Sequence, residues 1–218
     1  MEIRYSPGPK EYSRLTTPEL REAFLIESLF APGQLELAYS DADRAIAGSA
    51  MPAGSAIKLR ADAELRAAYF CERRELGVLN IGSEGGVEVD GKLYPMAKLD
   101  CLYVGRGSQN VSFSSRNAEN PAAFYLVSYP AHTTFPTAQA QVKDATPVEL
   151  GTVADANRRT IYKYIHPGGI LSSQLVMGFT RLAEGAVWNT MPPHTHTRRS
   201  EIYLYFDLDA KRRVMHFM

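Results

Sequence analysis

Short runs in which apolar and polar residues alternate follow one another along most of this chain, separated by turns rich in glycine. A period of two places successive side chains on opposite faces of an extended segment, so these runs predict β-strands. In the first part of the chain we expect strands at residues 35–39, 56–59, 68–72, 76–81, 87–89, 92–95, 98–104, 110–114 and 122–128. Many short strands with little helix predict an all-β sandwich or jelly-roll barrel.

Two local signals mark individual elements within this pattern. Val89-Asp90-Gly91-Lys92 predicts a tight hairpin, because Asp-Gly favours the turn conformations that join antiparallel strands. Thr17-Pro18-Glu19-Leu20 predicts the start of one short helix, with a hydroxyl cap, proline in the first turn and an early acid. We expect this helix to stop at Ala31-Pro32-Gly33.

A second β region follows a stretch that loses its periodicity. Its expected strands are residues 160–165, 175–182, 187–191, 201–206 and 212–217. Two β regions joined by a polar crossing predict a duplicated domain with an incomplete second half. We therefore divide the chain into an N-terminal arm and helix (1–33), a first barrel (34–136), a linker (137–159) and a partial second barrel (160–218).

Composition narrows the classes of function. The 24 basic and 24 acidic residues cancel, so the chain has no electrostatic footprint for nucleic acid or an anionic membrane. No signal-peptide core or membrane span is found in the sequence, and we expect a cytoplasmic protein. Cys71 and Cys101 lie in apolar runs, which favours buried free thiols, with a disulfide between them as the alternative.

The segment with the clearest chemistry is Met191-Pro-Pro-His-Thr-His-Thr-Arg-Arg-Ser-Glu201. In an extended segment His194 and His196 point the same way. Glu201 has the opposite parity, so we expect a turn at residues 197–200 that brings it back opposite the histidines. Two imidazoles and a carboxylate form a good site for zinc, iron, manganese or nickel. A His-x-His pair is also often a surface coincidence, and that reading stays open.

Other side chains near this segment are weaker candidates. Arg198 and Arg199 can fork a carboxylate of a substrate, or simply keep an exposed turn soluble. Tyr203 and Tyr205 share a face with Glu201 by parity. The remaining candidates for pocket residues are Lys163, His166 and His132, each with a structural role as the alternative. No catalytic base is identified.

The His-x-His-x4-Glu arrangement resembles the first cupin motif. The longer run at 188–206, together with 72–82, 125–136 and the terminal His216-Phe-Met, is similar to the bacterial 4-deoxy-L-threo-5-hexosulose-uronate ketol-isomerases. This resemblance implies a bicupin, with a metal-free first barrel and a zinc-bearing second barrel. It also implies a hexamer that interconverts 5-dehydro-4-deoxy-D-glucuronate and 3-deoxy-D-glycero-2,5-hexodiulosonate in the catabolism of pectin and related uronates.

The same resemblance assigns three zinc ligands to His194, His196 and Glu201. The fourth ligand of the family is a histidine expected beyond residue 218. The chain stops inside an apolar run, so we expect a C-terminal truncation, which puts the activity of this chain in question. His216 does not match that fourth ligand by pattern.

Two other functions fit the same residues. Two histidines and one carboxylate also form the triad that binds Fe(II) in oxygenases, so a cupin dioxygenase is an alternative. A barrel that binds a uronate without catalysis is another.

Overall fold

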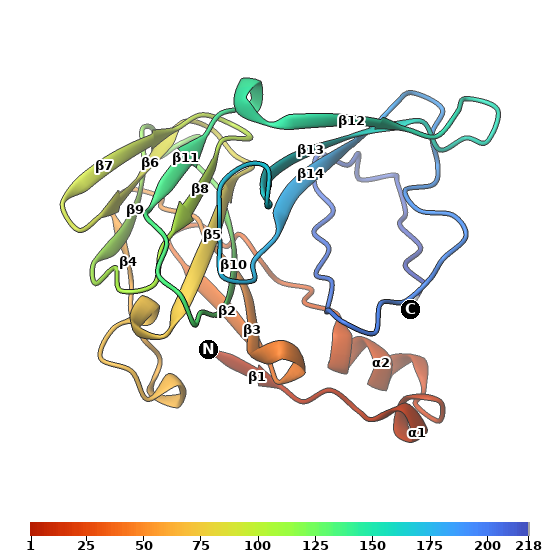
Figure 1. Ribbon diagram of the computed structural model, residues 1–218, viewed down its shortest axis with the longest axis horizontal. Helices are drawn as coiled ribbons and strands as arrows, with labels where there is room; N and C mark the ends of the chain where they lie inside the picture. Colours follow the sequence, from red (N-terminus) through yellow and green to blue (C-terminus); the bar gives the residue numbers. More distant parts are fainter. Residues whose placement is uncertain (218) are drawn as a thin grey trace.

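Three β-sheets form the framework of the computed structural model, which describes residues 1–217 (Figure 1). The first sheet has the order β1-β2-β3-β10-β5-β8-β11, the second β4-β9-β6-β7 and the third β12-β13-β14. The strands are β1 (Glu2–Arg4), β2 (Leu35–Ser40), β3 (Ala45–Ala50), β4 (Ile57–Leu59), β5 (Arg74–Asn80), β6 (Gly85–Val89), β7 (Lys92–Met96), β8 (Cys101–Val104), β9 (Val111–Ser115), β10 (Phe124–Pro130), β11 (Ala138–Ala140), β12 (Thr146–Leu150), β13 (Arg159–Ile165) and β14 (Met177–Leu182). The helices are α1 (Pro9–Tyr12) and α2 (Thr17–Phe24), with 3-10 turns η1 (Ala42–Arg44), η2 (Ala63–Leu65), η3 (Phe70–Glu72) and η4 (Val142–Asp144).

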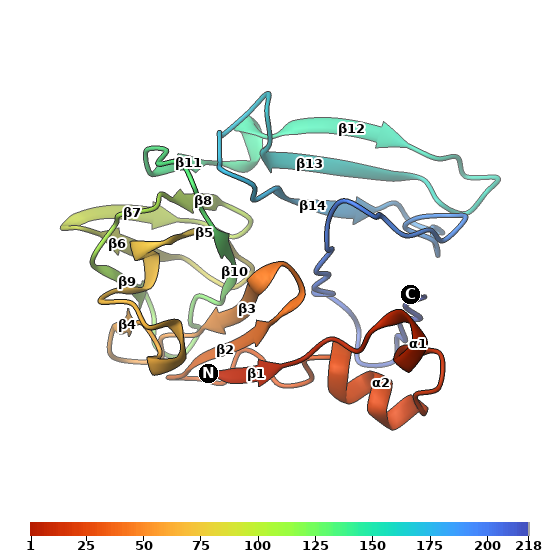
Figure 2. The same cartoon turned by 60° about the horizontal axis from the view of Figure 1, so that its bottom comes forward.

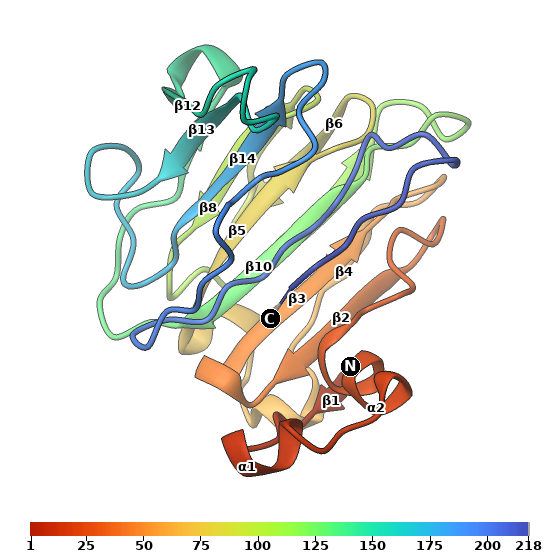
Figure 3. The same cartoon turned by 90° about the vertical axis from the view of Figure 1, so that its right-hand side faces the viewer.

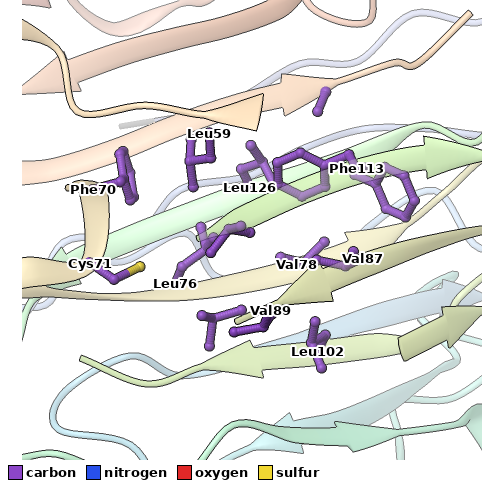
Figure 4. Close-up of a cluster of buried hydrophobic side chains, with 14 of the residues drawn as sticks. Leu59, Phe70, Cys71, Leu76, Val78, Val87, Val89, Leu102, Phe113 and Leu126 are labelled. Atoms are coloured by element: carbon purple, nitrogen blue, oxygen red, sulfur yellow. The ribbon is translucent and has the colours of Figure 1, made fainter. Parts of the chain in front are cut away.

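A core of buried apolar side chains fills the space between the first and second sheets (Figure 4). Alternate residues of β5 and β10 point into it, among them Val78 and Leu126, and meet Val87 and Phe113 from the four-stranded sheet. The rings of Phe113 and Phe124 lie 5.4 Å apart between centroids. The alternation of apolar and polar residues predicts two sheets packed face to face through their inward side chains. The structure shows this packing and confirms the all-β fold of cupin type.

The opposite face of the first sheet is also buried, and it positions the candidate site. The layer of β12, β13 and β14 lies over it (Figure 2). A second apolar cluster forms there from β5, β8 and β10 on one side and Tyr164, Leu175, Met177 and Phe179 on the other. In the described residues, the sheet of β12, β13 and β14 does not close into a barrel.

Several expected elements are confirmed. β6 and β7 form the hairpin around Asp90-Gly91, with Val89 opposite Lys92. α2 has proline in its first turn and a capping box between Thr16 and Glu19, one residue earlier than expected. Cys71 and Cys101 are buried free thiols.

Other expectations are wrong in detail. The helix ends at Phe24 instead of reaching residue 31, and residues 70–72 form a 3-10 turn rather than a strand. The stretch 137–159, in which no strand was expected, contains β11 and β12, which pair with β8 and β13. Conversely, no strand is assigned at 187–191, 201–206 or 212–217 within the described chain. The division into barrels and linker stays a prediction.

Neither α1 nor α2, the α-helices of residues 1–217, could span a membrane.

Candidate functional site

The histidine segment lies at the surface, after β14. Residues 183–200 form turns and irregular backbone, in which His194 is exposed and His196 half-buried. Ser200 anchors the end of this segment to the first sheet. Its backbone N–H donates to Asp43 Oδ2 at 2.8 Å, and its hydroxyl lies 3.3 Å from Tyr129 Oη.

From Ser200 the chain crosses the outer face of the first sheet in an extended form (Figure 3). Ile202, Leu204 and Phe206 pack on the second apolar cluster. Lys98 pairs with Asp207 at 2.8 Å at the far end of this crossing. Because these half-buried residues alternate along the chain, the side chains between them point away from the sheet: Glu201, Tyr203 and Tyr205 are exposed. The prediction that Glu201, Tyr203 and Tyr205 share one face is therefore confirmed, although this segment pairs with no strand among the described residues.

His196 and Arg199 contact Glu201, and His194 contacts His196. His196 Nε2 lies 3.2 Å from Glu201 Oε1, and the rings of His194 and His196 are 4.9 Å apart in an edge-to-face arrangement. Arg199 donates to Glu201 Oε1 from Nε at 3.1 Å and from Nη2 at 2.8 Å. The same Nη2 lies 3.0 Å from His196 Nε2. His196 Nε2 therefore faces both the guanidinium of Arg199 and the carboxylate of Glu201.

These contacts set the charge of the cluster. Burial works to raise the pKa of Glu201, but hydrogen bonds from Arg199 and Tyr203 and the charges of Arg199 and His196 outweigh it. The pKa of Glu201 is therefore lowered, and the carboxylate is ionised at neutral pH. Tyr203 Oη donates to Glu201 Oε2 at 2.8 Å. Burial, followed by this hydrogen bond, raises the pKa of Tyr203 to about 12, so it stays a donor.

Whether these residues suit a metal can be judged from their chemistry and placement. Two imidazoles and one carboxylate are a donor set that zinc takes. The positively charged guanidinium of Arg199 contacts two of the three donors, His196 and Glu201. In residues 1–217, however, no three His, Cys, Asp or Glu side chains lie close enough together to hold a metal. The three residue types suit zinc, but in this arrangement their side chains do not converge on one point, and the Arg199 guanidinium contacts two of them.

A second pair of polar side chains continues the exposed face. Tyr205 Oη lies 2.7 Å from His216 Nδ1, and the ring of Tyr203 lies 5.3 Å from that of His216. The alternation of side chains along residues 201–205 predicted that both tyrosines lie on the face of Glu201. The partnership with His216 was missed, because it depends on how residues 207–212 turn back.

The other candidates lie outside this cluster. Arg198 is exposed, and Lys163 is half-buried in β13. His166 accepts at Nδ1 from Gly168 N at 3.2 Å, and His132 is held through its backbone by Ser173 and Arg106. Among the described residues, no hydrogen bond or ion pair joins these four to His194, His196 or Glu201.

The fold and this cluster define a cupin-type β protein with a His-x-His-x4-Glu segment. The KduI/IolB family profile matches residues 25–218, and the chain belongs to this family. A relative from Shouchella clausii (strain KSM-K16), named 4-deoxy-L-threo-5-hexosulose-uronate ketol-isomerase, is 55% identical over the whole chain and 79% of its own length. Relatives of the same name from Halalkalibacterium halodurans and Lachnoclostridium phytofermentans are 50% and 49% identical over the same shares. The expected enzyme class, an isomerase of the aldose–ketose type, is the one these names give.

Among solved structures, an IolB-like protein from Salmonella typhimurium LT2 has a TM-score of 0.42 with 14% identity, over 59% of this chain and 44% of that chain. The assignment of the fold rests on the sheets of this chain itself.

Proposed function

We propose that this protein is a ketol-isomerase that interconverts 5-dehydro-4-deoxy-D-glucuronate and 3-deoxy-D-glycero-2,5-hexodiulosonate. The observation that carries the proposal is the 55% identity, over the full length of this chain, to a relative named for this activity. As part of the same proposal, we place the reaction in the cytoplasm and in the catabolism of pectin-derived uronates. The assembly that we propose is a hexamer.

The reaction moves a proton between adjacent carbons and passes through an enediolate. It needs a group that stabilises negative charge on oxygen and a group that carries the proton. The substrate also has a carboxylate, for which Arg198 and Arg199 offer planar guanidinium donors at the edge of the cluster. An ionised Glu201 orients Tyr203, which donates to its Oε2 at 2.8 Å.

We propose zinc as the cofactor, held by His194, His196 and Glu201. Support comes from the donor set and from the guanidinium that His196 and Glu201 already share. When bound, zinc supplies a Lewis acid that polarises substrate oxygens.

The test is conversion of the purified uronate followed by NMR, with the protein loaded with zinc and then stripped by a chelator. We expect conversion with zinc, and a loss of at least about 100-fold without it, as for metals that stabilise several kcal/mol of developing charge. Glu201→Gln is expected to lower zinc content in parallel, whereas Glu184→Gln, at an exposed position before the motif, leaves it unchanged.

Oxygen uptake is recorded in the same reactions. Conversion without uptake supports the isomerase. Uptake that depends on iron would instead favour a cupin dioxygenase, and binding of the uronate without turnover by the zinc-loaded protein would favour a non-catalytic binding module.

A further inference from the structure

One pair of side chains on the exposed face has no role in the site described above. Tyr205 and His216 come from two extended segments that run side by side, drawn in dark blue in Figure 3. Tyr205 Oη and His216 Nδ1 lie 2.7 Å apart, and their ring centroids are 6.2 Å apart at 79°. Tyr203 connects this pair to the motif, because its hydroxyl bonds to Glu201 while its ring stands 5.3 Å from that of His216.

We propose that His216 is the catalytic residue that carries the proton between the two adjacent carbons, and that Tyr205 is its positioning residue. This inference deepens the proposed isomerase function and rests on it. In the tautomer that this role requires, His216 Nδ1–H donates to Tyr205 Oη, 2.7 Å away, and the Nε2 lone pair is the proton acceptor. A hydrogen bond at one ring nitrogen is the usual way to select the tautomer of a working histidine.

The other polar groups of the face are already engaged. Glu201 is a ligand of the proposed zinc site and its Oε2 accepts from Tyr203, so this carboxylate is not the group that takes a proton from a substrate carbon. An imidazole can take a proton at one ring nitrogen and return it, and histidine is the side chain most often used as a general acid and base. His216 also lies one tyrosine ring away from Glu201, a separation that a six-carbon sugar acid can span.

The step balances without an oxidant or reductant. Nε2 takes the proton from the carbon that bears the hydroxyl, and the electron pair of that C–H bond forms the double bond of an enediolate. The π pair of the neighbouring carbonyl moves onto its oxygen. Nε2–H then returns the proton to the former carbonyl carbon, and the hydroxyl proton moves from one oxygen to the other.

The experiment compares His216→Asn, Tyr205→Phe and a matched control, His132→Asn, in the zinc-loaded protein. His132 is exposed, and its described contacts use its backbone. For each protein, kcat, KM, zinc content and deuterium uptake from D2O into the sugar are measured. We expect His216→Asn to lower kcat about 100-fold with KM within about threefold, the range that general acid–base catalysis contributes. Deuterium uptake falls with kcat and zinc content is unchanged.

Tyr205→Phe is expected to lower kcat about tenfold and to keep deuterium uptake in proportion, since the base remains but its tautomer is no longer held. His132→Asn is expected to match the wild type. Loss of zinc together with activity in His216→Asn would make the histidine a ligand and overturn the proposal, as would a kcat equal to that of His132→Asn. A wild-type protein that binds zinc but leaves the uronate unchanged would instead overturn the proposed function itself.

Discussion

At the scale of single residues, Arg199 determines how the donors of the motif are held. Its guanidinium contacts Glu201 twice and His196 once, so a metal at these donors must displace it. Exposed ion pairs of this kind contribute about 1 kcal/mol, which corresponds to roughly fivefold in a binding constant. We therefore predict that Arg199→Met binds zinc about fivefold more tightly than the wild type, as measured by competition with a chromophoric chelator.

Arg198→Met is the matched control for this prediction. It removes the same charge from the neighbouring position, where the described structure has no bond to Glu201 or His196. Its zinc affinity is expected to stay within twofold of the wild type. Equal gains in both variants would show that net charge, rather than the bridge, governs zinc binding.

The alternation of side chains along residues 201–205 could be predicted from the sequence. Because alternate side chains of an extended chain point to opposite sides, the sequence predicts that Tyr203 and Tyr205 share a face with Glu201. The structure confirms this, with the half-buried side chains of Ile202 and Leu204 between them. The Arg199 bridge could not be predicted, because it depends on the backbone dihedral angles of a turn that tolerates many conformations.

At the scale of elements, Glu75 joins β5 to the loop before β14. Its side chain is fully buried and accepts from Tyr103 Oη and from the backbone N–H groups of Ser173, Gln174 and Leu175, at 2.7–2.8 Å. Glu75→Gln puts an N–H₂ donor where an oxygen accepted. Each buried donor that loses its acceptor costs about 1–3 kcal/mol, so we predict a loss of about 3 kcal/mol in the free energy of unfolding by urea.

Glu88→Gln, at an exposed position of β6, is the control and is expected to change stability by no more than about 0.5 kcal/mol. If both variants unfold at the same urea concentration, the hydrogen bonds of Glu75 do not stabilise the loop.

The sequence predicts elements that depend on a local turn or cap signal. It does not predict short strands that form only because a neighbouring strand pairs with them. Asp90-Gly91 favours one turn whatever surrounds it, and the β6–β7 hairpin formed as expected. β11 and β12 are short and mostly polar or half-buried, and they are strands because β8 and β13 offer free edges to pair with. The reverse holds for residues 201–206, which keep the alternation of a strand but are not paired.

At the scale of the whole molecule, one apolar cluster joins the two β regions. Leu79, Tyr125 and Val127 of the first sheet contribute to it, and so do Leu175 and Met177 of the second region. A Cβ added at Gly77 would lie 2.7 Å from Met177 Sδ and 2.8 Å from Leu175 Cδ2, so these side chains pack directly on the backbone of β5. A shared core of this kind makes the two regions unfold together.

We therefore predict that the fluorescence of Trp188, the single tryptophan, and the far-UV circular dichroism report one coincident urea transition. Leu175→Ala removes a fully buried side chain at the junction and is expected to cost about 3 kcal/mol. It also moves the Trp188 transition to lower urea than the dichroism, because the second region then unfolds first. Leu59→Ala, in the core between the first two sheets, is expected to shift both signals together. Separate transitions in the wild type would contradict a shared core.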